Sequence, residues 1–293
     1  MKGVNKSTDT SSLSRISKWG TNAPSLDEDG LARSRNPSLN VSIQSAAEEK
    51  PGLETFGGSD EEHRQRLVTI GEQVGCLAHD IRNPLSSIEW FATLLGREQH
   101  SQEERKELAD HCVQAVRSLD RLVSNILIFS SPLQAEQETV NFRTVCQEVE
   151  LLARYPLRKK RVTIHHLQEG HLDSIRGHES LLKQGLLNLL LNAIHASEPD
   201  STIEIHCRNE WRDIHEKGKR RLQQGVALRI QDFGCGMSGE ELSHIFRPFY
   251  SRRKGGTGLG LPIVQQIVHL HHGVIDITSQ QGKGTTVDLF FPL

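Results

Sequence analysis

The sequence has no long apolar run, and this excludes several classes of protein. None of its 293 residues falls in a run of about 18 or more apolar residues, so we expect no transmembrane helix. The N-terminus also lacks the apolar core of a secretory signal. The formal net charge is only −2, so neither nucleic acid nor a membrane surface is an expected partner. We therefore expect a cytoplasmic protein with no membrane insertion.

Paired cysteines are missing as well. The five cysteines are scattered and form no C-x-x-C pair, which argues against a disulfide framework and against a zinc site. The fifteen histidines include two clusters, His165–His166 and His269–His272. Neither cluster has cysteine or carboxylate partners at ligand spacing, so we expect no transition-metal site there.

What the sequence does contain suggests two modest domains behind a polar extension. Apolar residues make up 35% of the chain and charged residues 25%. Residues 1–60 are rich in Ser, Asn, Asp, Glu and Gly and show no apolar period, so we expect them to be mostly disordered. Residues 61–135 follow a helical pattern, and residues 136–293 alternate between helix and strand patterns.

The helical part predicts a hairpin. Apolar residues recur at steps of three and four from about Glu61 to Arg97, and again from Ser101 to about Ser131. Pro84 should kink the first helix, and Ser101 with Glu104 predicts a capping box for the second. A hairpin alone leaves its apolar stripes half covered. We expect it to pair with a second copy in a dimeric four-helix bundle, unless it packs on the second domain instead.

The second part predicts an α/β sandwich in which helices cover one face of a mixed sheet. The expected helices are residues 142–153, 178–196 and 262–270, and the expected strands are residues 161–165, 202–206, 226–230, 274–277 and 286–290. The charged connector over residues 208–224 is long for a turn. It could be a surface docking loop, but an extended solvated hairpin is the simpler interpretation.

One histidine in the first helix stands off the apolar stripe. His79 lies two residues from both Leu77 and Ile81, so it points away from the buried seam. The simplest alternative is an ordinary surface histidine. However, the run His-Asp-Ile-Arg-Asn-Pro-Leu, with Asp80 and Asn83, resembles the phospho-acceptor box of two-component sensor histidine kinases, HExxNP or HExRNPL. Asp80 stands where Glu is more usual, which keeps the carboxylate and shortens its reach.

Four further motifs follow in order. Asn188 and Asn192 lie four apart on one helix, so both amides face the same side. An Asp-Phe-Gly-Cys-Gly motif begins at Asp232, a Phe-Arg-Pro-Phe motif occupies residues 246–249, and a Gly-rich loop over residues 255–261 leads into a helix. Each is weak alone. Together they resemble the Bergerat-type ATP-binding domain that histidine kinases share with the gyrase, MutL and heat-shock-chaperone ATPases.

The resemblance implies specific roles for these residues. Asn192, with Asn188, would bind the Mg²⁺ that bridges the triphosphate. Asp232 would accept a hydrogen bond from the N6 amine of adenine. The implied backbone contacts to the base and to the phosphates come from Gly234, Gly236, Gly256, Thr257, Gly258, Leu259 and Gly260. Related kinases often read F-F-T-T-K before this loop. Here Arg253 takes the place of the lysine, and which of Arg252, Arg253 and Lys254 meets the γ-phosphate is open.

The resemblance therefore implies a sensor histidine kinase that uses ATP and Mg²⁺. His79 would be phosphorylated, Asp80 would orient its ring, and the phosphoryl group would pass to the receiver domain of a response regulator. Asn83 would position water for dephosphorylating that regulator. The form of the His79 motif resembles that of the kinases that serve regulators in nitrogen or flagellar control.

Two alternatives belong to other classes. One is an ATPase of the gyrase, MutL and chaperone superfamily, which would need a catalytic Glu within the asparagine helix, whereas Glu179 and Glu198 only flank it. The other is a non-catalytic dimeric scaffold, which would not need the glycines and Asp232 together.

Overall fold

The fold is given by a computed structural model of the chain. It describes residues 39–44, 58–97, 100–130, 137–168, 172–216, 219–253 and 256–293. In these ranges, no helix combines the length and the apolar character that crossing a membrane would require.

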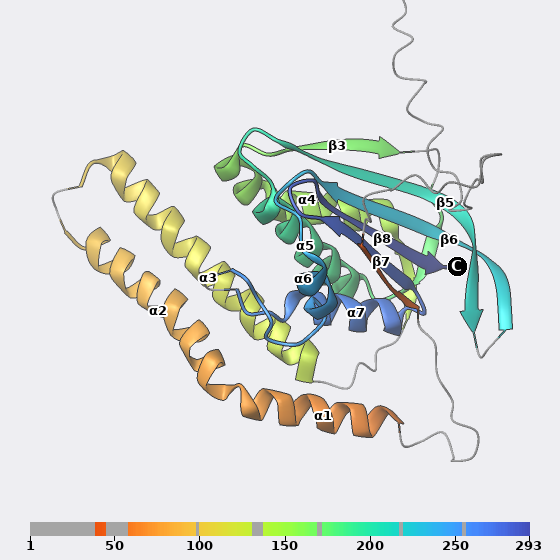
Figure 1. Cartoon of the computed structure of the whole chain (residues 1–293). Coiled ribbons are helices and arrows are strands. Elements are labelled where there is room, and N and C mark those ends of the chain that lie inside the picture. The colour runs from red at the N-terminus through yellow and green to blue at the C-terminus, as the bar shows by residue number, and fades with distance from the viewer. Residues whose placement is uncertain are drawn as a thin grey trace, which may run out of the picture. The chain divides into compact units, whose positions relative to one another are not determined.

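Three helices form the helical part. They are α1 (Gly58–Glu72), α2 (Val74–Leu95) and α3 (Gln102–Ser130). Helices α2 and α3 pack side by side as a hairpin (Figure 1). The capping box at the start of α3 is confirmed: the Ser101 N–H donates to Glu104 Oε2 at 2.8 Å, and the Glu104 N–H donates to Ser101 Oγ at 3.2 Å.

The expected single first helix is wrong. The chain leaves helical geometry at Gln73, which has φ −105° and ψ 11°, so α1 and α2 are separate helices. Two exposed glycines, Gly71 and Gly75, flank this break, and glycine is among the weakest helix formers. By contrast, α2 runs through Pro84 without interruption. The break therefore lies on the N-terminal side of His79.

The second part is an α/β sandwich. Its helices are α4 (Phe142–Lys160), α5 (Glu179–Ala196), α6 (Gly239–His244) and α7 (Gly260–Leu270). The strands are β1 (Leu39–Gln44), β2 (Glu138–Asn141), β3 (Thr163–Gln168), β4 (Ser174–Gly177), β5 (Thr202–Glu216), β6 (Lys219–Asp232), β7 (Val274–Gln280) and β8 (Gly284–Pro292). In the described ranges, one sheet has the order β1-β7-β8-β6-β5-β3, and β2 pairs with β4. Only β3 and β5 pair in parallel within that larger sheet.

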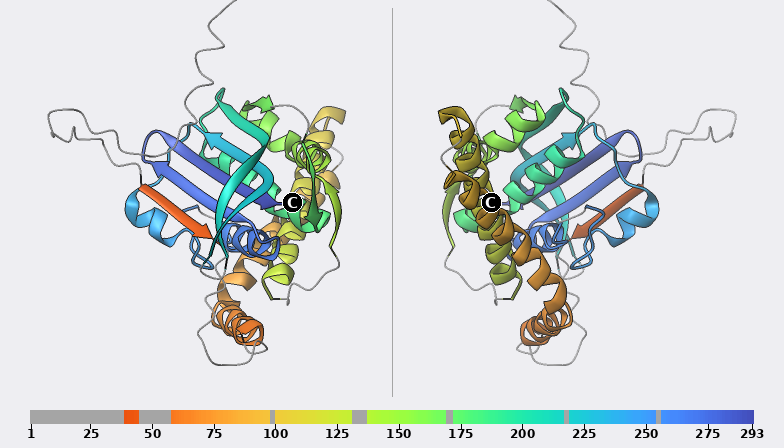
Figure 2. Two further views of the ribbon diagram at one scale, coloured as in Figure 1. Left: turned by 90° about the vertical axis from the view of Figure 1, so that its right-hand side faces the viewer. Right: turned by 90° about the vertical axis from the view of Figure 1, so that its left-hand side faces the viewer.

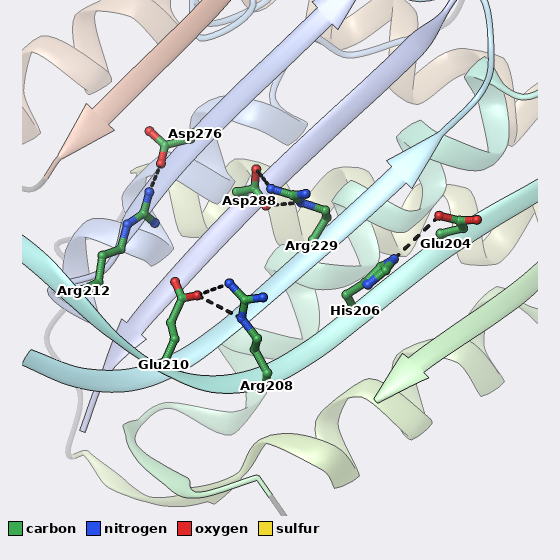
Figure 3. A network of polar contacts seen from close by, with 8 residues as sticks. All are labelled: Glu204, His206, Arg208, Glu210, Arg212, Arg229, Asp276 and Asp288. Atoms are coloured by element: carbon green, nitrogen blue, oxygen red, sulfur yellow. Dashed lines mark hydrogen bonds and ion pairs between the residues drawn. The ribbon is translucent and has the colours of Figure 1, made fainter. Parts of the chain in front are cut away.

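The two faces of the large sheet differ in chemistry. Helices α4, α5 and α7 lie along one face and enclose the apolar core (Figure 1). The other face carries ion pairs that link β5, β6, β7 and β8 (Figure 3). Arg229, for example, donates two hydrogen bonds to Asp288, at 2.5 and 2.9 Å, and Arg212 pairs with Asp276. A single covered face confirms the expected two-layer sandwich with a mixed sheet.

The structure corrects several expected elements. Strand β1 lies inside the extension that was expected to be mostly disordered; the rest of residues 1–57 is outside the described residues. Helix α4 continues past Ala153 and through Pro156 to Lys160, where basic residues in its last turn favour the helix dipole. The extended hairpin is confirmed, because β5 and β6 pair continuously from Glu204 opposite Gln231 to Glu216 opposite Lys219.

The helical hairpin also contacts the sandwich. Near the end of α3, Phe129 is 3% exposed and meets Phe249 edge-on, with 6.3 Å between ring centroids. Asn125 Oδ1 accepts a hydrogen bond from Gln184 of α5 at 2.7 Å. Part of the apolar stripe of α3 is thus buried against the second part, as the alternative to the bundle predicted, while other apolar residues of the hairpin, such as Val116, stay exposed.

Candidate active site

His79 presents one ring nitrogen to the outside. Its side chain is 70% exposed on α2. Nδ1 lies 3.5 Å from Asp80 Oδ1 and 3.4 Å from Asn83 Nδ2, one helical turn away. Both contacts are made at Nδ1. The arrangement therefore leaves Nε2 as the nitrogen that can meet an incoming group.

Asp80 can set the tautomer of this ring. When its carboxylate accepts the Nδ1–H of neutral His79, the lone pair of the imidazole is on Nε2. The carboxylate of Asp80 is partly shielded, with a side-chain exposure of 20%. Asp80, whose side chain is shorter than that of the more usual glutamate, therefore reaches Nδ1 of His79. The separation of 3.5 Å is long for a hydrogen bond.

A pocket of about 540 Å³ lies on the sandwich side of α3. Its walls come from α3, α5, the end of β6, the segment around α6, the Gly-rich loop and the sheet. Its polar lining includes the buried acid Asp232, two amides, from Asn188 and Asn192, and three guanidinium groups, from Arg121, Arg252 and Arg253. The pocket thus combines a buried acceptor with amide and cationic groups.

Asp232 ends β6 and is 5% exposed. Its Oδ1 accepts the N–H of Gly234 at 3.0 Å and the N–H of Thr285 at 3.3 Å. Burial raises the pKa of Asp232 to about 6, although the two backbone donors act in the opposite direction. Since both of these hydrogen bonds go to Oδ1, the second oxygen can accept a donor from a ligand in the pocket.

Only glycine fits at two positions after Asp232. A Cβ at Gly234 would lie 2.0 Å from the carbonyl oxygen of Ala196, at the end of α5. Gly236 has φ +60°, and its Cβ would lie 2.0 Å from the carbonyl oxygen of Gln280. The loop is therefore held between α5 and β7, so that backbone forms this side of the pocket.

The two asparagines meet the start of α7. A Cβ built on Gly260 would lie 3.9 Å from Cβ of Asn188 and 4.0 Å from Nδ2 of Asn192, so both amides border the helix N-terminus. Asn188 is 7% exposed, and its Nδ2 is buried without a hydrogen-bond partner. Such an orphaned amide is costly unless a ligand satisfies it. Amide oxygens suit a hard cation and amide donors suit phosphate, so the pair fits a magnesium-triphosphate group.

The Gly-rich loop ends at this helix N-terminus. Gly258 has φ +66°, and a Cβ there would lie 2.3 Å from the backbone carbon of Phe249. Thr257 Oγ1 accepts the N–H of Leu259 at 3.3 Å, and α7 begins at the next residue. Because the first N–H groups of a helix have no intrahelical partner, the loop delivers anion-binding donors to the pocket.

Two of the three cations after Phe249 have different partners. Arg252 and Arg253 both line the pocket, but Arg252 pairs with Glu241 at 2.6 Å, and Arg253 donates to Nδ1 of His195 at 2.6 Å. Lys254 lies outside the described residues. The loss of surrounding water, and then the charges of Arg253 and other nearby cations, lower the pKa of His195 to about 4. His195 is thus neutral at pH 7 and accepts the hydrogen bond from Arg253.

Several residues at the pocket were not predicted from the sequence, among them Thr285, His195 and Arg121. Thr285 supplies a backbone donor to Asp232 from a strand far along the chain. His195 follows Asn192 by three residues, so the helical period could have placed it beside the amides. Arg121 comes from α3, and burial followed by the charge of Arg253 lowers its pKa. Nothing in the sequence pattern shows that α3 would reach this pocket.

The pocket and His79 occupy separate places in this conformation. Among the residues that the structure describes, α3 lines the pocket but α2, which carries His79, does not. A group bound in the pocket therefore reaches His79 only after the two parts move, or in a second copy of the chain.

Comparison with known families finds two matches. The family described as "His Kinase A (phospho-acceptor) domain" matches residues 69–134. The family described as "Histidine kinase-, DNA gyrase B-, and HSP90-like ATPase" matches residues 177–293. The first match includes His79, and the second includes the asparagines, Asp232 and the Gly-rich loop.

Several bacterial proteins are similar over most of this chain. The sensor histidine kinase ZraS of Klebsiella oxytoca is 33% identical over 230 residues, which are 78% of this chain and 47% of ZraS. The signal transduction histidine-protein kinase AtoS of Escherichia coli K12 is 31% identical over 229 residues, or 78% of this chain and 36% of AtoS. The chain thus spans about half, or less, of the length of these relatives.

Solved structures share the fold. The histidine kinase ThkA in complex with the response regulator protein TrrA aligns with a TM-score of 0.56 and 24% identity, over 80% of this chain and 65% of that chain. The Acinetobacter baumannii histidine kinase AdeS aligns with a TM-score of 0.51 and 20% identity, over 73% of this chain and 97% of that chain.

Proposed function

The chain belongs to the sensor histidine kinases, and we propose that it binds Mg·ATP in the pocket and transfers the γ-phosphoryl group to Nε2 of His79. One observation supports this best: an oriented, exposed histidine and an ATP-type pocket with an orphaned amide occur in one chain. The gyrase-like ATPase alternative gains no support, because neither Glu179 nor Glu198 is among the described residues that line the pocket.

The polar groups that line the pocket would orient the nucleotide. The free oxygen of Asp232 accepts the adenine N6 amine, and guanine is disfavoured because it presents an acceptor at that place. Asn188 and Asn192 would hold the magnesium ion, which supplies charge neutralisation at the phosphates when bound. Arg253, Arg121 and the N–H groups at the start of α7 add positive potential around the γ-phosphate.

The transfer step needs the nucleophile that Asp80 prepares. The Nε2 lone pair of His79 forms a bond to the γ-phosphorus, the bond from this phosphorus to the β,γ-bridging oxygen breaks, and ADP leaves. The Nδ1 proton stays hydrogen-bonded to Asp80, which stabilises the positive charge that develops on the ring. Since α2 does not line the pocket, the reaction requires a different placement of the two parts or a partner chain.

Two partners follow from this proposal. The phospho-acceptor family is a dimerisation module, and exposed apolar residues on the hairpin, among them Leu85, Val113 and Val116, are available to a second copy. The phosphohistidine would then pass its group to an aspartate of a response regulator. Asn83, beside His79, would help to dephosphorylate that regulator, as the family resemblance implies.

The proposal can be tested with purified protein, γ-labelled ATP and Mg²⁺. We expect label on the protein that is lost in acid and survives alkali, because a phosphoramidate is acid-labile. Label that survives acid would indicate a serine or threonine acceptor and would contradict the proposal. Phosphate release without any labelled protein would favour an ATPase.

A second test concerns Asp80. Asp80→Asn should slow autophosphorylation by roughly 10²–10⁴-fold, because the carboxylate no longer stabilises the charge on the ring. The affinity for ATP should not change, since Asp80 does not line the pocket. Asp110→Asn, an exposed change on α3, is the matched control. Asn83→Ala should keep autophosphorylation and lose regulator dephosphorylation. An unchanged rate in Asp80→Asn would remove Asp80 from the reaction.

A further inference from the structure

A strand from upstream of the helical hairpin completes the sheet of the ATP-binding part. Strand β1 pairs antiparallel with β7 over its whole length, from Leu39 opposite Ser279 to Gln44 opposite Val274. Figure 2 shows it as the orange arrow along the sheet edge, beside the blue strands. The chain then continues to α1, so the segment before the hairpin is bound to the part that follows it.

The register couples this strand to the pocket. Val41 is partly buried, packs against the core and stands opposite Ile277. Ile277 is 1% exposed and is also one of the residues that line the pocket. Two positions further along β7 lies Ser279. Its Oγ accepts a hydrogen bond at 2.9 Å from the N–H of Met237, the residue that follows Gly236. Strand β1 therefore supports the residues of β7 that hold the glycine loop after Asp232.

A second contact leads to the same pocket. Helix α6 packs against β1, and the two lie next to each other in Figure 2. This helix carries Glu241, which lines the pocket and pairs with Arg252 of the segment that follows Phe249. The strand thus touches the pocket's surroundings through β7 and through α6.

The segment is suited to reversible docking. Its sequence, Leu-Asn-Val-Ser-Ile-Gln, alternates apolar and polar residues and has no charge. Without it, β7 would present an edge of unpaired backbone groups, which is a template for an added strand. An edge strand that pairs with a single neighbouring strand can leave without unfolding the rest of the sheet.

We propose that the outer edge of β7 is a docking edge for residues 39–44, and that docking of this strand is coupled to nucleotide binding. Docking holds β7, the glycine loop and α6 in the arrangement that binds the adenine, so release of the strand weakens the affinity for nucleotide. By linkage, a bound nucleotide strengthens the docking of the strand to the same degree. The proposal rests on the proposed function only in naming ATP as the ligand.

The first experiment measures affinity for a non-hydrolysable ATP analogue in the full chain. Val41→Asp places a charge against Ile277 and should release the strand, which we expect to weaken binding by about fivefold or more. Asn40→Asp is the matched control: it adds the same charge one residue away, at the register position opposite Thr278. Equal affinities in the two variants would overturn the proposal.

The second experiment locks the strand with a disulfide. Asn40 and Thr278 are directly opposite in the register, so Asn40→Cys with Thr278→Cys should cross-link under a mild oxidant. Asn40→Cys with Thr286→Cys is the control, because Thr286 lies one strand further on and is out of reach. We expect the analogue to accelerate the first cross-link and the locked chain to bind at least as tightly as wild type. No cross-link, or one that the analogue does not accelerate, would contradict the proposal.

These outcomes separate the docking edge from the kinase activity. Cross-linking without nucleotide reports the strand alone and requires no catalysis. If the strand cross-links but the wild-type chain binds no ATP analogue, the proposed function fails and the coupling fails with it. If the analogue binds and the strand does not cross-link, only the docking edge fails.

Discussion

Replacing His79 with alanine should abolish incorporation of label from γ-labelled ATP. The variant removes the nitrogen that attacks the γ-phosphorus, so the transfer loses its acceptor. The affinity for ATP should match that of wild type, because no residue of α2 lines the pocket in the described ranges. The two measurements are labelled protein after acid and alkali treatment, and binding of a fluorescent ATP analogue.

A matched variant guards this result against a folding defect. His111 on α3 stacks on Phe91 with 4.9 Å between ring centroids, so His111→Ala removes a histidine that packs the same hairpin. We expect His111→Ala to keep the label. Retained acid-labile label in His79→Ala would show that another histidine is the acceptor. Loss of label together with loss of ATP binding would place the effect in folding.

The periodic elements were predictable because their signals are local. The three-and-four spacing of apolar residues indicated the hairpin, and a strand pattern followed by Asp232 and two glycines indicated the loop whose backbone leaves no room for a side chain. The paired amides of Asn188 and Asn192 could likewise be placed on one helix face from their spacing alone. In each case the residues that interact are close in sequence.

The features that escaped prediction depend on contacts between distant segments. The break at Gln73 results from two glycines whose separate costs are small. Strand β1 carries a short alternating pattern inside a polar stretch, and only its pairing with β7 makes it a strand. Arg121 enters the pocket because α3 packs on α7 and accepts a hydrogen bond from Gln184 of α5, contacts that no pattern in α3 specifies. The raised pKa of Asp232 also depends on burial that only the assembled sheet provides.

Asp232→Asn should weaken ATP binding by roughly 10–100-fold, the value of a hydrogen bond to a charged group. The asparagine oxygen can still accept the N–H groups of Gly234 and Thr285, which turns its amide donor toward the N6 amine of adenine. The same donor suits the O6 acceptor of guanine, so the preference for ATP over GTP should narrow. Asp200→Asn is the control, because Asp200 is exposed and has φ 62°, which asparagine accepts readily. Unchanged ATP affinity in Asp232→Asn would remove Asp232 from the adenine site.

The pH dependence gives this variant a second, opposite signature. Burial raises the pKa of Asp232 from 3.8 to about 6, so the folded protein prefers the protonated acid. The stability that this preference contributes is present below pH 3.8 and is lost as the pH rises through about 6. At pH 7.5 the unliganded wild type therefore bears a buried charge that costs on the order of 3 kcal/mol, and the neutral asparagine removes it. We expect unliganded Asp232→Asn to melt at a higher temperature than wild type at pH 7.5, with the difference shrinking toward pH 4.

The affinity of the wild type for ATP should fall below pH 6, while the affinity of the variant should not depend on pH. A carboxylate that serves only to bind the ligand should destabilise the unliganded protein at pH 7.5, so its removal should raise stability. A variant that binds ATP poorly and is also less stable at pH 7.5 would instead show that the carboxylate holds the loop together.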